Sequence, residues 1–283
     1  MKILLKKFVK PIVSLFGLEK VTYTLFMKVC SWYYVMTSYF NNTFRHTARI
    51  LIYHRIAVVD KDPHLLCVTP ECFEEQIKWL SSHFDIISLP ELHLRIVGKK
   101  IVGNEAVITL DDGYRDNLTN ALPILEKYQV PATIFVTTAW LGQVAALPWD
   151  MEYSETDRAI FLTAEEIANL AQNPLITIGA HTHTHPRLGD LNAVEQASEI
   201  QNSKKILADI TKQDIATFAY PFGGIFDTNA TTRQLAKSSG YLLACATIPR
   251  LVTSSSPLFA LPRFNIRNYS LTELSKMLYN HDS

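Results

Sequence analysis

The chain has 283 residues, of which 48 % are apolar and 19 % are charged. This balance is typical of a globular protein with a sizeable core and excludes intrinsic disorder. Lys plus Arg equals Asp plus Glu at 27 each, which argues against a nucleic-acid binder because such proteins carry a basic excess. Four cysteines without a CxxC pair exclude a disulfide framework and indicate buried or free thiols.

The zero net charge hides a basic N-terminal segment. Residues 1–50 hold eight basic residues and one acid, a net charge of +7. Apolar residues recur there at helical spacing with lysines between them: Leu4, Phe8, Ile12, Leu15 and Phe16. Two interpretations stay open, a helix on an anionic membrane surface or a helical layer packed on the rest of the protein. We therefore divide the chain into a basic amphipathic segment, 1–46, and a main domain, 47–283, with membrane contact expected through residues 1–40.

From residue 47 onward, short apolar runs alternate with amphipathic stretches. The predicted strands are 50–54, 85–89, 106–110, 132–138, 175–181, 216–222 and 241–247. The predicted helices are 70–83, 120–130, 163–172, 192–210 and 229–240. This alternation predicts an α/β protein with a parallel sheet covered by helices, either doubly wound or a closed barrel. No glycine-rich phosphate loop follows a strand, which disfavours Rossmann and P-loop enzymes.

Polar side chains gather where these strands end. His54 follows the first run, Asp111 and Asp112 the third, His181 the fifth and Tyr220 the sixth. In α/β proteins the carboxyl ends of parallel strands lie on one rim, where chemistry is carried out. The sequence therefore predicts one site on this rim.

Two of these groups have the residue types of a metal centre. Asp111-Asp112-Gly113 puts two carboxylates side by side, and one can bind a metal while the other faces the reacting group. The alternative is a turn in which one Asp caps the helix near Asn117. His181 and His185 have the HxxxH interval of metal ligands, although a solvated histidine-rich loop is also compatible. With Asp112 they would form a two-histidine, one-carboxylate site for Zn²⁺ or Fe(II) with open positions.

Two further strand ends are candidates with plain structural alternatives. His54 is either a functional histidine or a hydrogen-bonded core residue. The segment Tyr220-Pro221-Phe222-Gly223-Gly224 is a turn whose backbone N–H groups could face a developing oxyanion, or it is an ordinary turn.

These pieces in this order resemble the polysaccharide deacetylase family, the NodB-homology group of carbohydrate esterases. TLDDGY (109–114) is similar to its first motif, HTHTH (181–185) to its second and YPFG (220–223) to part of its third. The resemblance runs from about residue 48 to 270. It implies a distorted (β/α) barrel and a divalent metal, usually Zn²⁺. It also implies that Asp112, His181 and His185 hold the metal and that Asp111 is the catalytic base. On physical grounds, the metal and the Phe222 N–H would hold the oxyanion.

The sequence departs from the family pattern at two places. Ala219 stands where the third motif normally has Arg, and the late Leu-x-His motif, source of the general acid, is missing. The segment ILIYHRI (50–56) resembles the permuted branch that deacetylates poly-N-acetylglucosamine, in which the acid lies upstream, and points to His54. Arg263, in LPRFN (261–265), is the candidate for the missing Arg beside Asp111, from sequence position alone.

Three hypotheses follow. The first is a metal-dependent deacetylase of an N-acetylated sugar in an exopolysaccharide, cell-wall glycan or lipid-linked glycan. The second is a glycan-binding relative without catalysis, and the third is another metallohydrolase or Fe(II) enzyme. We expect Tyr220, Trp149 and Arg263 on the substrate side of the site, with Trp149 either stacking on a sugar or packing in the fold. No A-x-A cleavage site is visible. We therefore expect a cytoplasmic, membrane-associated protein, with an uncleaved anchor outside the cytoplasm as the alternative.

Overall fold

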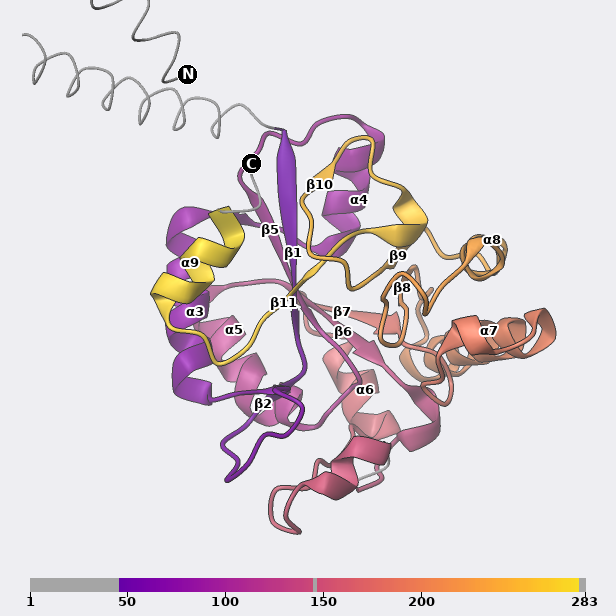
Figure 1. The fold of residues 1–283 in the computed structure, drawn as a ribbon, viewed down its shortest axis with the longest axis horizontal. Coiled ribbons are helices and arrows are strands. Elements are labelled where there is room, and N and C mark those ends of the chain that lie inside the picture. Colours follow the sequence, from indigo (N-terminus) through magenta and orange to yellow (C-terminus); the bar gives the residue numbers. More distant parts are fainter. Residues whose placement is uncertain (1–45, 145–146, 280–283) are drawn as a thin grey trace, which may run out of the picture. The chain divides into compact units, whose positions relative to one another are not determined.

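The computed structural model describes residues 46–144 and 147–279 (Figure 1). The expected N-terminal segment, its membrane contact, the domain boundary at residue 46 and Cys30 therefore lie wholly or partly outside the described residues. The strands are β1 Thr47–Tyr53, β2 Arg55–Ile56, β3 Cys67–Val68, β4 Asp85–Ile86, β5 Glu105–Leu110, β6 Ala132–Val136, β7 Ile176–Ala180, β8 Thr217–Ala219, β9 Leu243–Cys245, β10 Val252–Thr253 and β11 Phe264–Asn265. The α-helices are α3 Pro70–His83, α4 Leu89–Val97, α5 Leu122–Tyr128, α6 Ala164–Leu170, α7 Ala193–Thr211, α8 Ala230–Ser238 and α9 Leu271–Tyr279. Within the described ranges, no helix has both the length and the apolar character needed to cross a bilayer.

The helices begin where short polar side chains cap them. Thr69 accepts a hydrogen bond from the Cys72 N–H at the start of α3, and Thr163 and Glu166 form the predicted capping box of α6. Asn192 caps α7 in the same reciprocal way with Glu195. These caps satisfy backbone N–H groups that the first turn of a helix leaves unpaired, so they fix the point at which each strand-to-helix connection ends.

The strands form a curled parallel sheet that nearly closes on itself. Its order is β10-β1-β5-β6-β7-β8-β9, and β1, β5, β6, β7, β8 and β9 run parallel. The gap between β9 and β1 is bridged by the segment 261–265: Leu261 pairs with Cys245, and β11 pairs in parallel with β1. In Figure 1 the strands meet in the middle and the helices lie around them. The predicted (β/α) barrel is therefore present in distorted, incompletely paired form.

Two apolar layers hold the sheet in place. On β1, Leu51 and Tyr53 pack into the larger cluster with residues of the outer helices, whereas Ala48 and Ile50 pack into a second cluster with α4. This alternation reflects the two faces of a strand. Each large apolar side chain that is fully buried contributes about 1.5–3 kcal/mol to the burial free energy. The cysteines Cys67, Cys72 and Cys245 are free, as expected for the part of the chain described.

The sequence prediction missed some elements and misjudged others. The predicted strand 85–89 is only Asp85–Ile86, because Ser88 caps α4, a helix that was not predicted. The predicted helix 120–130 begins earlier, with a π-helical turn over Asn117–Ala121. The short strands β10 and β11 and the helix α9 were also not predicted. The six other predicted strands and the helices predicted at 70–83, 163–172, 192–210 and 229–240 are confirmed in position.

Candidate active site and metal centre

The two aspartates follow β5 in a sharp turn. The Asp111 N–H donates to the Tyr53 carbonyl at 2.9 Å, which continues the pairing of β5 with β1. Asp112 then takes a left-handed conformation with φ of 73° and Gly113 follows with φ of 82°. This turn sends the two carboxylates to different partners, so the alternative of a turn with a capping Asp does not describe this segment.

Asp111 pairs with Arg263 in a two-pronged ion pair. The Arg263 Nη1 and Nη2 atoms donate to the two Asp111 oxygens, each at 2.7 Å. Nη1 also donates to Thr109 Oγ1 at 3.1 Å and Nε donates to the Ala246 carbonyl at 3.0 Å. Burial works to raise the pKa of Asp111, but the Arg263 charge and hydrogen bonds outweigh it and hold the pKa below its usual value. Asp111 is therefore kept as an oriented carboxylate.

Asp112 faces the two histidines that follow β7. Its Oδ1 lies 3.4 Å from His181 Nε2 and 3.2 Å from His185 Nε2. One ligand atom from each of the three residues lies within 4.8 Å of the others. His181 Nδ1 lies 2.8 Å from the Ala219 carbonyl, which can only accept, so Nδ1 carries the proton and Nε2 offers its lone pair. The donor set fits a divalent cation that takes nitrogen and oxygen ligands.

The charges in this cluster also suit metal binding. Burial would raise the pKa of Asp112, but its interaction with the facing His181 and His185 rings holds it well below its usual value. Burial lowers the pKa of His185 despite the Asp112 carboxylate beside it. Metal ligands must be deprotonated, and these shifts favour a carboxylate and a neutral imidazole.

The turn that carries the histidines is held by its neighbours. Thr182 and His185 have φ of 65° and 63°, and the Thr182 hydroxyl accepts the His185 N–H at 3.0 Å. Glu199, on α7, accepts the His183 and Thr184 N–H groups at 2.8 Å each. His183 turns away, and its Nδ1 lies 2.9 Å from Thr138 Oγ1. The first and last histidines of HTHTH therefore face Asp112, and the middle one does not.

Two aromatic rings stand beside the metal centre. The Trp149 and Phe222 rings lie 5.1 Å from the His185 ring, and 5.8 Å from each other. The Trp149 Nε1–H donates to the Tyr114 hydroxyl at 3.1 Å, which fixes the indole. Trp149 is half-buried and Phe222 is 37 % exposed. The structure thus brings both residues to the predicted site.

His54 lies at the same rim, immediately after β1. It is half-buried, and it acts on both Asp111 and Asp112 by lowering their pKa values through its charge. Its Nδ1 is buried and has no hydrogen-bond partner among the described residues. The alternative that His54 is a hydrogen-bonded core histidine is therefore not supported. Asn117 donates its amide to the His54 carbonyl at 2.8 Å and fixes the backbone there.

The expectation that the Tyr220 and Arg263 side chains contact substrate is not supported. Tyr220 is 1 % exposed, and its hydroxyl donates to the Phe259 carbonyl at 3.0 Å. Arg263 is fully buried, and each of its hydrogen bonds goes to the protein. The Arg263 guanidinium does stand beside Asp111, as its place after the third motif suggested. Both side chains support the site from within the fold.

Several supporting residues were missed by sequence reasoning. Glu199 and Asn117 sit on helices, and nothing in their spacing points to the histidine turn or to His54. Arg187 and Asp227 form an ion pair at the edge of the site. Arg187 lies two residues after the last histidine, which is the one signal that could have drawn attention to it.

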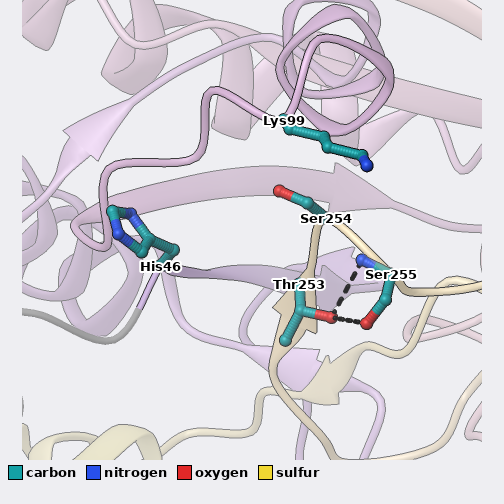
Figure 2. Close-up of a pocket in the computed structure, with 5 residues that line it drawn as sticks. All are labelled: His46, Lys99, Thr253, Ser254 and Ser255. Atoms are coloured by element: carbon teal, nitrogen blue, oxygen red, sulfur yellow. Dashed lines mark hydrogen bonds between the residues drawn. The ribbon is translucent and has the colours of Figure 1, made fainter.

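A separate cavity lies elsewhere on the domain. It has a volume of about 430 Å³ and is lined by His46, Lys99, Thr253, Ser254 and Ser255 (Figure 2). His46 precedes β1, so this cavity is at the amino ends of the strands, opposite the carboxyl ends that carry the aspartates and histidines. It contains none of the predicted site residues and does not change the assignment of the site.

Comparison with known proteins identifies relatives of this chain. The family model of polysaccharide deacetylases matches residues 99–244. YxkH of Bacillus subtilis, assigned to the same family, is 30 % identical over 219 residues, covering 77 % of this chain and 70 % of that protein. The poly-beta-1,6-N-acetyl-D-glucosamine N-deacetylase of Staphylococcus aureus is 28 % identical over 218 residues, covering 74 % of this chain and 71 % of that protein.

A solved structure shares the fold. The Streptococcus pyogenes deacetylase PplD, determined in complex with acetate, superimposes with a TM-score of 0.68 at 25 % identity, covering 84 % of this chain and 98 % of that one. The shared fold and the matching family model cover the strands that carry the aspartates and histidines. The chain therefore belongs to the polysaccharide deacetylase family of hydrolases.

Proposed function

We propose that the protein is a metal-dependent hydrolase that removes acetyl groups from N-acetylated hexosamines of a polysaccharide or lipid-linked glycan. The observation that carries this proposal is the convergence of Asp112, His181 and His185 beside the Asp111–Arg263 pair. The Staphylococcus aureus relative, named for its action on poly-N-acetylglucosamine, supports an N-acetylglucosamine polymer as the substrate class. We assign Zn²⁺ as the metal because it takes imidazole and carboxylate ligands and the proposed hydrolysis needs a Lewis acid without redox chemistry.

The reaction divides among groups that the fold has already placed. A divalent cation held by Asp112, His181 and His185 would polarise the acetyl carbonyl and make a water more acidic. As the water oxygen attacks the carbonyl carbon, the Asp111 carboxylate takes the water's proton. The Arg263 fork orients Asp111 for this transfer and keeps it ionised beforehand.

The second half of the reaction needs a donor for the oxyanion and an acid for the amine. None of the hydrogen bonds among the described residues uses the Phe222 N–H, so this donor is free for the oxyanion. When the carbon–nitrogen bond breaks, the amine nitrogen must gain a proton, and we assign His54 as its donor. Acetate and a free amino sugar are the products.

The half-buried Trp149 indole and the exposed part of the Phe222 ring provide apolar surface for the sugar. Aromatic faces pack against the C–H faces of sugar rings by burying apolar area. Trp149 is therefore assigned to substrate positioning.

The test is acetate release from N-acetylglucosamine oligomers by the purified protein with Zn²⁺ or Co²⁺, repeated with a chelator. We expect metal-dependent release that disappears with chelator and with Asp111→Asn. Binding of the oligomers without any acetate release by a metal-loaded protein would instead support the glycan-binding alternative. The matched control is Asp209→Asn, an exposed aspartate that pairs with Lys205 near the end of α7, which should retain activity.

A further inference from the structure

The backbone at Phe222 is held in an unusual turn. Phe222 has φ of 61°, a left-handed conformation that a side chain with a Cβ disfavours. The Gly223 N–H donates to the Pro221 carbonyl at 2.6 Å, so three residues close a turn around Phe222. With positive φ at the centre, this is the rare and strained form of the γ-turn. Surrounding contacts must therefore hold Phe222 in place.

Arg187 supplies the closest of these contacts. Its guanidinium carbon lies 3.8 Å from the centre of the Phe222 ring, a close cation–π contact. Asp227 in turn holds the Arg187 guanidinium, with which it forms an ion pair through Nη1. Arg187 follows the histidine turn after β7, whereas Phe222 and Asp227 belong to the loop after β8. One side chain thus joins the two loops that frame the metal centre.

Asp227 also ties the rest of the Phe222 loop. Its Oδ2 accepts the Gly224 N–H at 2.8 Å, and its carbonyl accepts the Gly189 N–H at 2.9 Å. At Gly189 an added Cβ would lie 2.4 Å from the Phe226 carbonyl oxygen, so the two loops are in backbone contact there. The Arg187–Asp227 pair is therefore part of a continuous set of contacts between the loops.

We propose that Arg187 is a positioning residue, which clamps the Phe222 ring so that the strained turn presents its backbone N–H to the reacting acetyl group. This inference rests on the proposed function, in which that N–H stabilises the oxyanion. The Arg187 side chain is half-exposed, so direct contact with substrate is the competing role. The two roles differ in kinetics, because a clamp acts on the transition state and a substrate contact acts mainly on binding.

The first experiment compares Arg187→Gln with Arg115→Gln. Arg115 is a matched control, since its side chain is 48 % exposed and paired with Glu166, as the 50 % exposed Arg187 is paired with Asp227. Loss of a whole oxyanion donor lowers kcat about 10²–10³-fold. For a donor that is loosened but not removed, we expect Arg187→Gln to lower kcat roughly tenfold with KM nearly unchanged. Bound Zn²⁺ and the melting temperature should match the wild type, and Arg115→Gln should retain full kcat.

The second experiment repeats Arg187→Gln in a Phe222→Gly background. Glycine takes positive φ without strain and has no ring to clamp. In this background, Arg187→Gln should therefore lower kcat by less than about twofold. An equal loss of kcat in both backgrounds would overturn the proposal, as would a raised KM with unchanged kcat or a parallel loss of Zn²⁺ and melting temperature. If the wild-type protein releases no acetate, it is the proposed function that fails, before Arg187 is tested.

Discussion

Arg263 gives the sharpest test of how the site is built. We expect Arg263→Met to lower the free energy of unfolding by about 3–5 kcal/mol, the usual effect of leaving one partner of a buried ion pair alone. The structure supports the upper part of this range, because four hydrogen bonds are lost and the Asp111 carboxylate, 3 % exposed, keeps no cationic partner on that side. Methionine keeps much of the length of the arginine side chain. It also keeps an apolar contact with Phe135, whose ring centre lies 5.5 Å from the Arg263 guanidinium carbon.

The assay is urea and thermal unfolding in the presence of chelator, so that metal binding does not contribute. At about 2–4 °C per kcal/mol for a domain of this size, the melting temperature should fall by roughly 6–20 °C. The double variant Arg263→Met/Asp111→Asn should be more stable than Arg263→Met, because both buried charges are then removed. Additivity of the two single changes within about 0.5 kcal/mol would refute the coupling.

Three further predictions concern the metal, the acid and the pH dependence of stability. His181→Ala should abolish Zn²⁺ binding, whereas His183→Ala, in the same motif but turned toward Thr138, should retain it; equal losses in a dialysis assay would contradict the assignment. His54→Ala should lower kcat about 10²–10⁴-fold, the usual contribution of an acid, with Zn²⁺ still bound, and unchanged turnover would return His54 to a structural role. For Glu105, hydrogen bonds from backbone N–H groups and from Arg95 outweigh burial and lower its pKa from 4.5. The ionised Glu105 carboxylate therefore stabilises the folded state above pH 4.5, and this contribution is lost as the pH falls through the folded-state pKa. Glu105→Gln should therefore lower the free energy of unfolding by about 1–3 kcal/mol at pH 7 but by less near pH 3, and a pH-independent difference in urea unfolding would count against this reasoning.

The cluster of Asp112, His181 and His185 could be predicted from sequence because local rules bring these side chains together. Strand ends are visible as breaks in apolar runs, and parallel strands bring their carboxyl ends to one rim. Asp112 and His181 follow β5 and β7, which are separated in the sheet by β6 alone. The two neighbouring carboxylates were expected to have different partners, and Asp111 pairs with Arg263 whereas Asp112 faces His181 and His185. The left-handed backbone at Asp112 was not foreseen.

The partners of these side chains could not be predicted with the same certainty because they come from distant parts of the chain. Arg263 stands 152 residues from Asp111, and only its place in a family-like segment suggested it. Glu199 lies on a helix whose apolar periodicity was visible, but periodicity does not say which polar residue turns inward. The short strand β11 has two residues, too few for an alternating pattern.

The closing segment 261–265 has a consequence for the timing of synthesis. Asp111 and its partner Arg263 are separated by 152 residues, which the ribosome adds in roughly 8–30 s at about 5–20 residues per second. Through that interval Asp111 exists without its cation, because Arg263 follows even β9 in the sequence. A nascent chain therefore carries Asp112, His181 and His185 well before Asp111 gains its buried cation, and the Asp111–Arg263 pair forms only with the last part of the barrel.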